Sequence, residues 1–468
     1  MKILALLLSL SLLVLTHELG HLGFAKLFHT RVRRFYLFFN PVFSIFKAKK
    51  FGGKWHFLFF STKEPDEWKE ENLSEADRDN TLWGIGWVPL GGYCYIAGMI
   101  DETKSEKDLE STPQPWEYRT KPAWQRLCII SGGVLVNFIS ALIIYTGIFA
   151  HWGKDELPLR NASLGYEYCE FLHDEGFVDG DIIYQIDGYE MFDFAETQQH
   201  LTLDNPRKVV VLRDDSLVTL TLSGNLQSQL LENGGKDLVL MAPRMPFVVK
   251  DYVAGSAAKR AGVLPGDSLV AVDGQPMPVA TDIMAALKAA ADDSLTLGFI
   301  RDGQRVDIRM AIPSDGKIGV QLVSDIGDLF DVLHSDYNII QAIPVGISYG
   351  WETLVKYVSS LKMLFAPGGA QALGGFGTLG SLFPNEWNWH AFWSITAFLA
   401  VILAFMNVIP IPGLDGGHIL FTLWEIVTRR KPSDQFLTIA QNVGMALLLA
   451  LLILANGNDL WRWIQGLI

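Results

Sequence analysis

Four long apolar stretches constrain this chain more than any other feature of its sequence. They fall within residues 1–30, 123–150, 387–412 and 435–457. About 20 apolar helical residues are needed to cross the hydrocarbon core of a bilayer, and each stretch reaches that length. The chain is 49% hydrophobic and has a positive mean hydropathy of +0.22, which agrees with this interpretation. We therefore predict a polytopic α-helical membrane protein with four transmembrane helices.

Basic residues mark one end of the four predicted spans. Arg33 and Arg34 follow the first span, Arg119 precedes the second, and residues 429–431 connect the third to the fourth. Lys and Arg accumulate on the cytoplasmic side of membrane proteins, so this end is predicted to be cytoplasmic. Both termini and the long region 152–388 are then expected outside, in the periplasm of a Gram-negative cell.

Charge and cysteine content exclude two classes of protein. The net charge of −13 argues against a nucleic-acid partner, because such binding neutralises phosphates with Lys and Arg. Cys94, Cys128 and Cys169 lie far apart and form no CxxC pair. An odd number of widely spaced cysteines gives no disulfide framework.

The region between the second and third spans contains an internal repeat. EGFVDGDIIYQIDG ends at Gly188 and AGVLPGDSLVAVDG ends at Gly274; both follow the pattern G-x-x-x-G-D, an apolar run, then D-G. Such a repeat indicates two copies of one small domain, predicted at 156–245 and 246–326. The pattern resembles PDZ domains, an α+β fold that binds peptides by adding a strand to a sheet edge. Steric exclusion of large substrates is the alternative role for both copies.

Three further segments have patterns of their own. Residues 31–122 are expected to form a cytoplasmic or re-entrant β region, because aromatic, β-favouring runs alternate with turn signals; a small membrane-associated hairpin or sheet is predicted there. Within it, residues 62–80 are an acidic insert, expected as a solvated loop or helix. Residues 338–366 have apolar residues at helical spacing, which predicts an amphipathic helix on the membrane surface. The Gly-rich residues 366–380 predict a loop.

Two histidines and a glutamate interrupt the first apolar stretch. The sequence HELGH runs from His17 to His21, and ionisable groups inside a membrane span are costly, which makes a functional role the default. Residues four apart share one helix face, so both histidines can hold one Zn²⁺ while Glu18 serves as general base. A cleaved signal peptide is the alternative for residues 1–30, but no small-residue cleavage site follows the apolar run.

A third metal ligand is expected, because a catalytic zinc usually has three protein ligands. The third span ends in NVIPIPGLDGGH, where two prolines must break the helix and glycines permit a sharp turn. Asp415 is the carboxylate in this stretch, within residues 413–434 that connect the last two spans. Coordination of a cation would compensate for its position at membrane depth. Capping of the following helix is its alternative role, and His418 is a rival ligand.

These residues resemble the site-2 protease family of intramembrane zinc metalloproteases. HELGH matches the HExxH motif of its first span, and NVIPIPGLDGG matches its N-x-x-P-x-P-x-L-D-G motif near the end of a later span. VPLGGY at 88–93 and KPAWQRLCIISGGVLVNF at 121–138 resemble the bacterial RseP-like branch, the regulators of sigma-E proteases, as does the tandem PDZ-like repeat. Residues 35–60 depart from that branch, because they lack its G-x-G loop.

The resemblance implies a function and a set of site residues. The enzyme would hydrolyse peptide bonds within or near the transmembrane segment of single-span membrane proteins, such as anti-sigma factors or remnant signal peptides. It would be a multi-pass protein of the bacterial inner membrane, with periplasmic PDZ domains and an active site near the cytoplasmic side. The implied residues are the zinc ligands His17, His21 and Asp415, the general base Glu18, and Asn407 with Pro410 for the substrate backbone.

Substrate unwinding needs a further element of the protein. A transmembrane helix hides its own peptide bonds, so we expect the substrate to pair as an added strand with the aromatic hairpin, at Phe57 and Phe59. The expected partners are thus single-span membrane proteins, the lipid bilayer and peptide ligands of the PDZ grooves.

Two other functions fit parts of the sequence. A catalytically inactive, PDZ-bearing membrane scaffold would recruit partners through its repeats and would not need Glu18. A metal transporter would need more polar residues along its spans than Asn137, Asn407 and Asn442. The complete set of two histidines, glutamate and aspartate favours the protease.

Overall fold

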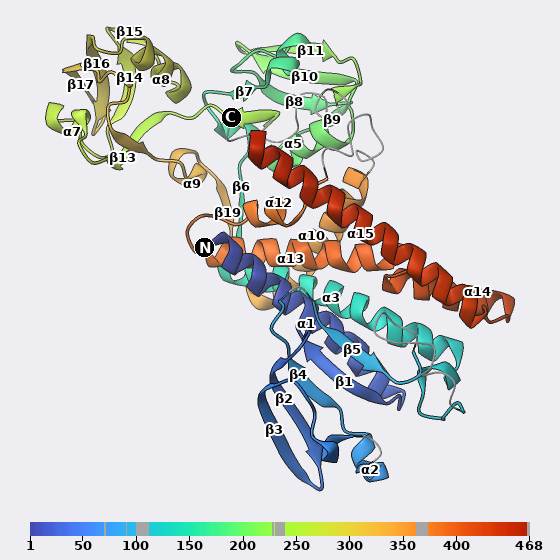
Figure 1. Ribbon diagram of the computed structural model, residues 1–468. Coiled ribbons are helices and arrows are strands. Elements are labelled where there is room, and N and C mark those ends of the chain that lie inside the picture. Colours follow the sequence, from blue (N-terminus) through green and yellow to red (C-terminus); the bar gives the residue numbers. More distant parts are fainter. Residues whose placement is uncertain are drawn as a thin grey trace. The chain divides into compact units, whose positions relative to one another are not determined.

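The computed structural model describes residues 1–69, 72–89, 91–99, 112–226, 229, 239–361 and 373–465. The chain divides into two compact units (Figure 1). Unit 1 comprises Met1–Trp152, Tyr337–Leu361 and the described residues from Leu373 onward, and unit 2 comprises Gly153–Asp336.

Four helices of unit 1 coincide with the four predicted spans, and their length and composition suit a multi-pass membrane protein. They are α1 (Lys2–Leu27), α3 (Ala123–Trp152), α13 (Trp389–Val408) and α15 (Asp434–Gln465). The third is shorter than predicted, because Pro410 and Pro412 follow its end. The fourth is longer, with Trp461 and Trp463 inside the helix. Only 6% of the apolar window of α15 is buried, so most of that helix is left to face lipid.

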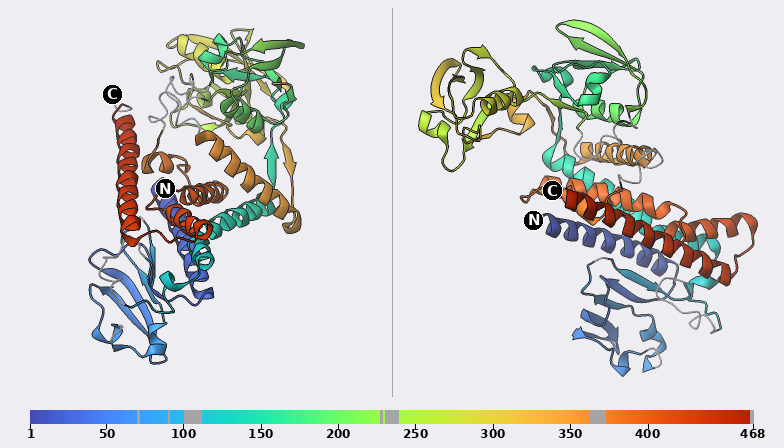
Figure 2. Two further views of the ribbon diagram at one scale, coloured as in Figure 1. Left: turned by 90° about the vertical axis from the view of Figure 1, so that its right-hand side faces the viewer. Right: turned by 45° about the horizontal axis from the view of Figure 1, so that its top comes forward.

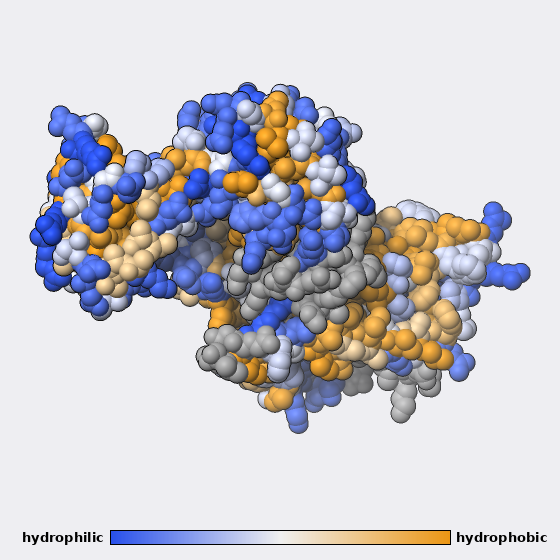
Figure 3. Space-filling view, turned by 90° about the horizontal axis from the view of Figure 1, so that it is seen from above, coloured by the Kyte–Doolittle hydropathy of each residue, from blue (hydrophilic) through white to orange (hydrophobic). Residues whose placement is uncertain are grey.

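Helix α3 is the centre of unit 1, because α1 and α13 both pack against it. The views in Figure 2 show these three helices side by side. Gly20 of α1 meets Gly132 of α3 so closely that a Cβ on Gly20 would lie 2.3 Å from the Gly132 carbonyl oxygen. Small residues allow this approach of two backbones in membrane helices. The apolar side chains seen in Figure 3 along the helices agree with a lipid environment.

Helix α10 (Ile339–Ser360) falls within the predicted amphipathic segment, of which residues 362–366 lie outside the described residues. A capping box between Asn338 and Gln341 begins it. Its small residues Gly346 and Gly350 face α3, where added Cβ atoms would lie 2.5 Å from Thr146 Oγ1 and 2.4 Å from the Leu142 side chain. The helix therefore packs along α3 and α13 as part of the helical unit.

Two shorter helices complete this part of unit 1. Within the stretch predicted as a loop, Phe376–Ser381 forms helix α12, while residues 366–372 lie outside the described residues. The loop prediction is wrong there because a residue distant in sequence stabilises the helix: Asp459 of α15 accepts hydrogen bonds from the backbone N–H groups of Gly375 (3.0 Å) and Thr378 (2.9 Å). Helix α14 (Asp415–Thr428) occupies most of the predicted connection between the last two spans.

Residues 32–96 form one five-stranded sheet, larger than a hairpin. Its strands are β1 (Val32–Leu37), β2 (Ser44–Phe51), β3 (Lys54–Ser61), β4 (Leu82–Ile85) and β5 (Tyr93–Ile96), in the order β3-β2-β4-β1-β5. The β2–β3 turn uses Gly52 and Gly53 with φ of +57° and +77°, the left-handed backbone that such tight hairpins require. The edge strand β5 and its neighbour β1 contact α1, and β3 is the opposite edge.

The described residues of the acidic insert at 62–80 pack against this sheet through Trp68. It contains the short helices η1 (Asp66–Trp68) and α2 (Glu75–Arg78). Trp68 is buried, and Asp79 accepts a 2.7 Å hydrogen bond from Arg31.

Unit 2 contains two α+β lobes, each with its own hydrophobic core. The first lobe has β7 (Tyr166–Tyr168), α4 (Glu170–Asp174), β8 (Ile182–Ile186), β9 (Tyr189–Glu190), α5 (Phe194–Leu203), β10 (Lys208–Arg213), β11 (Ser216–Thr221) and β12 (Met241–Pro243). The second has β13 (Phe247–Tyr252), α7 (Ala257–Ala261), β14 (Ser268–Val272), β15 (Gln275–Pro276), α8 (Ala280–Ala289), β16 (Ser294–Arg301), β17 (Gln304–Ala311) and β18 (Val320–Leu322). Helix α9 (Ile326–Leu329) follows.

The sequence repeat corresponds to the same ion pair in both lobes. Asp181 in the first lobe and Asp267 in the second each have side chains 1% exposed. Each carboxylate accepts two hydrogen bonds of 2.7–2.8 Å from one arginine, Arg213 or Arg301, at the end of a strand. The spacing of glycine, aspartate and strand that the two repeats share thus gives the same bidentate ion pair in each lobe. Strands β6 (Lys154–Glu156) and β19 (Leu333–Ser335) pair antiparallel and bring the two ends of unit 2 together.

Candidate metal centre

Helix α1 presents His17, Glu18 and His21 near one another. The two histidines are one turn apart, with ring centroids separated by 4.7 Å in an edge-to-face arrangement. Their Nε2 atoms lie 3.1 Å apart. Since a helix repeats every 3.6 residues, this spacing places both imidazoles on one face.

A chain reversal after α13 brings a carboxylate to the same place. Gly413 has φ of +98°, and a Cβ on Gly416 would lie 2.0 Å from the carbonyl oxygen of Ile409. The turn is therefore open to glycine alone at these two positions. Asp415 follows the turn as the first residue of α14.

The three side chains form a cluster suited to a metal ion. Asp415 Oδ2 lies 3.2 Å from His17 Nε2 and 3.4 Å from His21 Nε2. Ligand atoms about 2.0–2.2 Å from one tetrahedral zinc are separated by roughly 3.3–3.6 Å, close to these distances. It is the one group of at least three His, Cys, Asp or Glu side chains with metal-ligand spacing among the described residues. The rival His418 lies outside this group and lines a separate pocket.

The chemistry of the donors also fits a cation. Asp415 Oδ2 is buried, and no hydrogen-bond donor in the described part of the chain is aligned with it. A buried carboxylate oxygen in this state is costly unless a positive charge faces it. Two imidazoles and one carboxylate leave a fourth tetrahedral position open, as in catalytic zinc sites.

Hydrogen bonds behind the histidines fix the direction of their rings. His21 Nδ1 lies 2.9 Å from the carbonyl oxygen of Ile129, so Nδ1 carries the proton and the Nε2 lone pair points at the cluster. His17 Nδ1 lies 3.3 Å from the side-chain amide of Asn137. Thr16 Oγ1 lies 3.0 Å from the Leu13 carbonyl and 2.8 Å from that amide.

The Asn137 amide can satisfy all of these contacts in one orientation. One hydroxyl hydrogen cannot donate to two oxygens, so Thr16 donates to Leu13 and accepts from the Asn137 NH₂ group. This requires the amide to be turned by 180° about its last side-chain bond, because Asn137 Nδ2 now faces His17 Nδ1 and Oδ1 faces Thr16. In the turned orientation the Asn137 oxygen accepts the proton of His17 Nδ1, which leaves His17 Nε2 as a ligand atom. Asn137 is a site residue that sequence reasoning noticed only as a polar residue in a span.

Glu18 lies between the metal cluster and the β-sheet. The backbone N–H of Cys94, in β5, lies beside its carboxylate. A Cβ on Gly92, just before β5, would lie 3.1 Å from Val14 of α1, which confirms how closely this strand approaches the helix. An edge strand thus lies directly beside the predicted general base.

The four predicted substrate-binding residues occupy two different places. Asn407 is buried near the end of α13 and Pro410 is exposed in the turn that leads to Asp415. Phe57 and Phe59 are 56% and 67% exposed on β3, at the sheet edge opposite to β5. The structure thus places these two aromatics away from Glu18.

Comparison with known proteins identifies relatives along nearly the whole chain. A family model described as Peptidase family M50 matches residues 5–62 and 70–451. Three relatives named "Putative zinc metalloprotease" come from Ralstonia nicotianae (24% identical, covering 99% of this chain and 98% of the relative), Neisseria meningitidis (24%, 98% and 99%) and Xylella fastidiosa (27%, 97% and 97%). The similarity includes both segments that build the metal cluster.

Proposed function

Because the chain belongs to Peptidase family M50, the site-2 protease family, and is a zinc metalloprotease, we propose that its active site is the cluster of His17, His21 and Asp415 beside Glu18. One observation carries this proposal: the Asp415 carboxylate lies within 3.4 Å of two imidazole nitrogens. These nitrogens belong to a helix nearly 400 positions earlier in the sequence, so only folding brings the three groups together. Zinc bound there would acidify a water molecule and polarise the scissile carbonyl.

The other residues of the site have separate roles in peptide hydrolysis. Glu18 takes a proton from the attacking water and passes it to the leaving amine. Ile129 and Asn137 hold the two imidazoles in the tautomer that directs Nε2 to the ion. Asn407 and Pro410, which precede Asp415, contact the backbone of the substrate.

We propose that the substrate pairs with β5 rather than β3. A protease needs an extended peptide, whereas a transmembrane helix satisfies its backbone internally. A strand added at the β5 edge would lie next to Glu18, because the N–H of Cys94 in β5 lies beside the Glu18 carboxylate. Strand addition replaces the helical hydrogen bonds that the substrate loses. This reassigns the role that the sequence had suggested for Phe57 and Phe59.

The substrates are single-span membrane proteins in this proposal. The basic residues at the ends of the spans support an orientation in which the metal cluster is near the cytoplasmic side of a bacterial inner membrane and unit 2 is in the periplasm. The two lobes of unit 2 act as PDZ domains of the RseP-like branch, and they exclude substrates with bulky external domains. Cleavage would release anti-sigma factors or remove remnant signal peptides.

Glu18→Gln tests the activity and separates it from two rival functions. The full-length chain is reconstituted with a candidate single-span substrate, with and without a zinc chelator. We expect Glu18→Gln to bind zinc as the wild type does and to lose cleavage by at least about 10²-fold, since general acid–base catalysis contributes roughly 10²–10⁴-fold. A scaffold would keep its partner binding and show no chelator-sensitive cleavage in either form. A transporter would instead lose zinc flux.

A further inference from the structure

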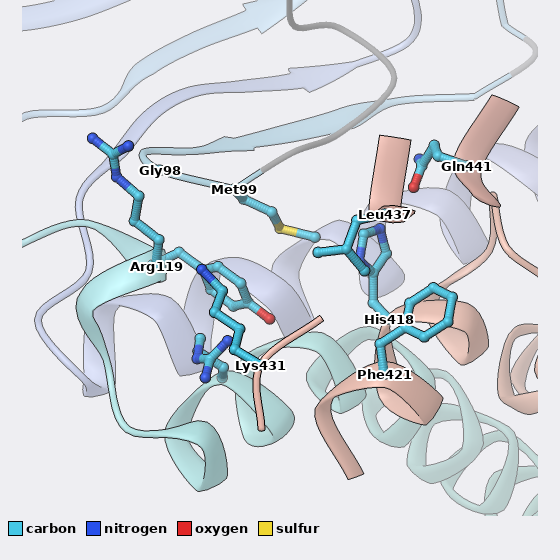
Figure 4. Close-up of a pocket in the computed structure, with 10 residues that line it drawn as sticks. Gly98, Met99, Arg119, His418, Phe421, Lys431, Leu437 and Gln441 are labelled. Carbon is cyan, nitrogen blue, oxygen red and sulfur yellow. The ribbon is translucent and has the colours of Figure 1, made fainter. Parts of the chain in front are cut away.

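Helix α14 carries large apolar side chains on its outer side and small or polar residues on its inner side. Five apolar side chains are 41–81% exposed: Leu420, Leu423, Trp424, Ile426 and Val427. The buried positions are small or polar: Gly416, Gly417 and Thr422. Ile419 adds a partly buried apolar contact, and His418 and Phe421 line a pocket with Leu437 of α15 (Figure 4). Because lipid is itself apolar, small residues and polar contacts decide where such a helix packs.

One polar contact of α14 is an ion pair with the first turn of α3. Arg126 Nη2 donates to Glu425 Oε1 at 2.5 Å, and the two side chains are only 10% and 19% exposed. Arg126 Nε donates a 3.0 Å hydrogen bond to the carbonyl oxygen of Lys121, which holds the guanidinium group in place. Removal of one partner would leave a nearly buried charge uncompensated, so this contact is costly to break.

A second polar contact lies one turn earlier along α14. Tyr118 and Thr422 are 8% and 5% exposed, and the hydroxyl of Tyr118 lies beside that of Thr422. Thr422 Oγ1 donates to the carbonyl oxygen of His418 at 2.8 Å, so its lone pairs can accept from the Tyr118 hydroxyl. Seven residues make nearly two helical turns, which places Thr422 on the same side of α14 as Asp415.

The same part of α3 also holds a histidine of the metal cluster. The carbonyl oxygen of Ile129, one helical turn after Arg126, lies 2.9 Å from His21 Nδ1. One short stretch of α3 thus contacts both helices that supply metal ligands. Metal–ligand distances are defined to within about 0.2 Å. If α14 rolled by about 30° about its axis, an atom about 5 Å from that axis would move by roughly 2.5 Å, far beyond this tolerance.

We propose that Arg126 is a positioning residue for the metal centre, because its pair with Glu425 fixes the rotation of α14 about its axis. That rotation directs the Asp415 carboxylate toward the two histidines of α1. Arg126 itself touches neither the metal nor the substrate. Its role presupposes a metal at this cluster, so the proposal rests on the proposed function and adds how the third ligand is held.

Zinc affinity of the full-length chain in detergent tests this role. Glu425→Gln keeps a hydrogen-bond acceptor of the same shape without the charge, and Arg126→Gln removes the other partner. The exchanged variant, Arg126→Glu with Glu425→Arg, restores a pair of opposite charges. Val427→Gln is the matched control, because Val427 is 81% exposed near the same end of α14. Dissociation constants are measured by competition with a chelator, and Co²⁺ in place of zinc reports the ligand geometry through its visible absorption.

Both single variants should bind zinc roughly tenfold more weakly or worse, since changes behind metal ligands cost about 10–100-fold in affinity. Their Co²⁺ absorption should lose tetrahedral character. The exchanged variant should recover most of the affinity, and Val427→Gln should match the wild type. Wild-type affinity and Co²⁺ absorption in Glu425→Gln would overturn the proposal, as would an exchanged variant no better than the single ones. If Arg126→Gln does not fold, Glu425→Gln and the exchanged variant decide the question.

Asp415→Ala separates this proposal from the proposed function. Loss of zinc from Asp415→Ala together with normal zinc binding by Glu425→Gln would reject only the role of Arg126. Full zinc binding by Asp415→Ala would reject the metal centre itself, and the positioning role with it.

Discussion

Gly133 of α3 makes room for both histidines of the metal cluster. A Cβ at this position would lie 2.5 Å from His21 Nε2 and 2.7 Å from His17 Cε1. Real Cβ contacts are not this short, so a side chain of any size must displace the imidazoles. The two metal ligands on α1 can therefore take their positions only because residue 133 of α3 has no side chain.

Gly133→Ala tests this dependence on one missing methyl group. Alanine favours a helix over glycine by about 1 kcal/mol, so α3 itself should not be weakened. We expect zinc affinity to fall by roughly 10–100-fold, the range seen when the residues supporting metal ligands are changed. Zinc per chain is measured by mass spectrometry after dialysis against graded zinc buffers.

The matched control is Gly147→Ala in the same helix, where a Cβ would meet nothing within 4 Å. It should bind zinc as the wild type does. Unchanged zinc affinity in Gly133→Ala would show that the histidines adjust freely and that α3 does not position them.

Local spacing explains which site residues the sequence could predict. His17 and His21 share a helix turn, so their proximity follows from four-residue spacing alone. Asp415 and His418 could not be ranked firmly, because their distance from α1 depends on the turn at Gly413 and Gly416. Asn137 acts across two helices, and no local pattern reports such a contact.

At the scale of elements, β5 is the strand that connects the sheet to the proposed chemistry. Cys94→Pro removes the backbone N–H that lies beside the Glu18 carboxylate. We expect it to reduce cleavage strongly while zinc content stays normal, because the general base loses the N–H beside it and proline disturbs the edge at which the substrate strand is proposed to pair. Phe57→Pro, on the opposite edge, should reduce cleavage far less.

Both variants are compared by cleavage rate and by zinc content in the same reconstituted preparations. The reverse result, with Phe57→Pro inactive and Cys94→Pro active, would show that the substrate pairs with β3 and not with β5. Equal activity of both with the wild type would reject strand pairing at either edge.

The order of the strands shows why the sequence suggested the other edge. The aromatic runs of β2 and β3 are adjacent and joined by two glycines, so the hairpin could be predicted from turn chemistry. The pairs β1–β4 and β1–β5 join segments about 50 residues or more apart. No local pattern in the sequence indicates which residues pair over such a separation. The strand at the edge next to α1 is determined by the packing of Val32, Phe35 and Ile96 with α1 and α3.

The ion pair between buried Asp267 and partly exposed Arg301 is expected to contribute to the stability of the second lobe. Hydrogen bonds from Arg301 and from the Leu264 backbone hold the pKa of the Asp267 carboxyl below its ordinary value, against the opposing effect of burial. A depressed pKa in the folded state contributes stability above the unfolded value near about 3.9, and this contribution is lost as pH falls through the folded pKa. Asp267→Asn should destabilise the lobe at neutral pH by about 3 kcal/mol.

Amide hydrogen exchange in β14 and β16 of the full-length chain measures this loss. The difference from the wild type should narrow as pH falls below about 4, because the unfolded chain then takes up a proton that the folded Asp267 carboxylate does not yet bind. Asp307→Asn is the control, because Asp307 and Arg305 form an exposed pair on the same lobe that contributes about 0–1 kcal/mol. A constant difference between Asp267→Asn and the wild type from neutral to acid pH would contradict the assignment.

At the scale of the whole molecule, the sequence predicted the spans better than their connections. Apolar length is a local property, so all four spans could be located. Helix α12 could not, since glycine-rich residues form it only when Asp459 of α15 binds its first N–H groups. The division into two units follows from the chain passing into unit 2 at β6 and out again at β19.

This passage makes unit 2 removable as a block. Lys154 pairs with Ser335 and Glu156 pairs with Leu333, so residues 157–332 begin and end on neighbouring strands. An Asn-Gly turn can close such a two-stranded ladder in their place. Unit 1 keeps its own hydrophobic clusters, which connect α1, α3, α13 and the sheet. Zinc content of the excised chain should therefore equal that of the full chain.

The excised chain then tests whether unit 2 selects substrates by size. Two substrates share one transmembrane segment and differ in the external part, a short tail in one and a folded domain in the other. The full chain should cleave the first and spare the second, and the excised chain should cleave both, because removal of unit 2 leaves no barrier to the folded domain. Cleavage must disappear in the excised chain that also carries Glu18→Gln, which ties both products to the same active site. If the full chain cleaves both substrates equally, unit 2 is no size filter, and peptide binding by its lobes becomes the stronger account of why they are present.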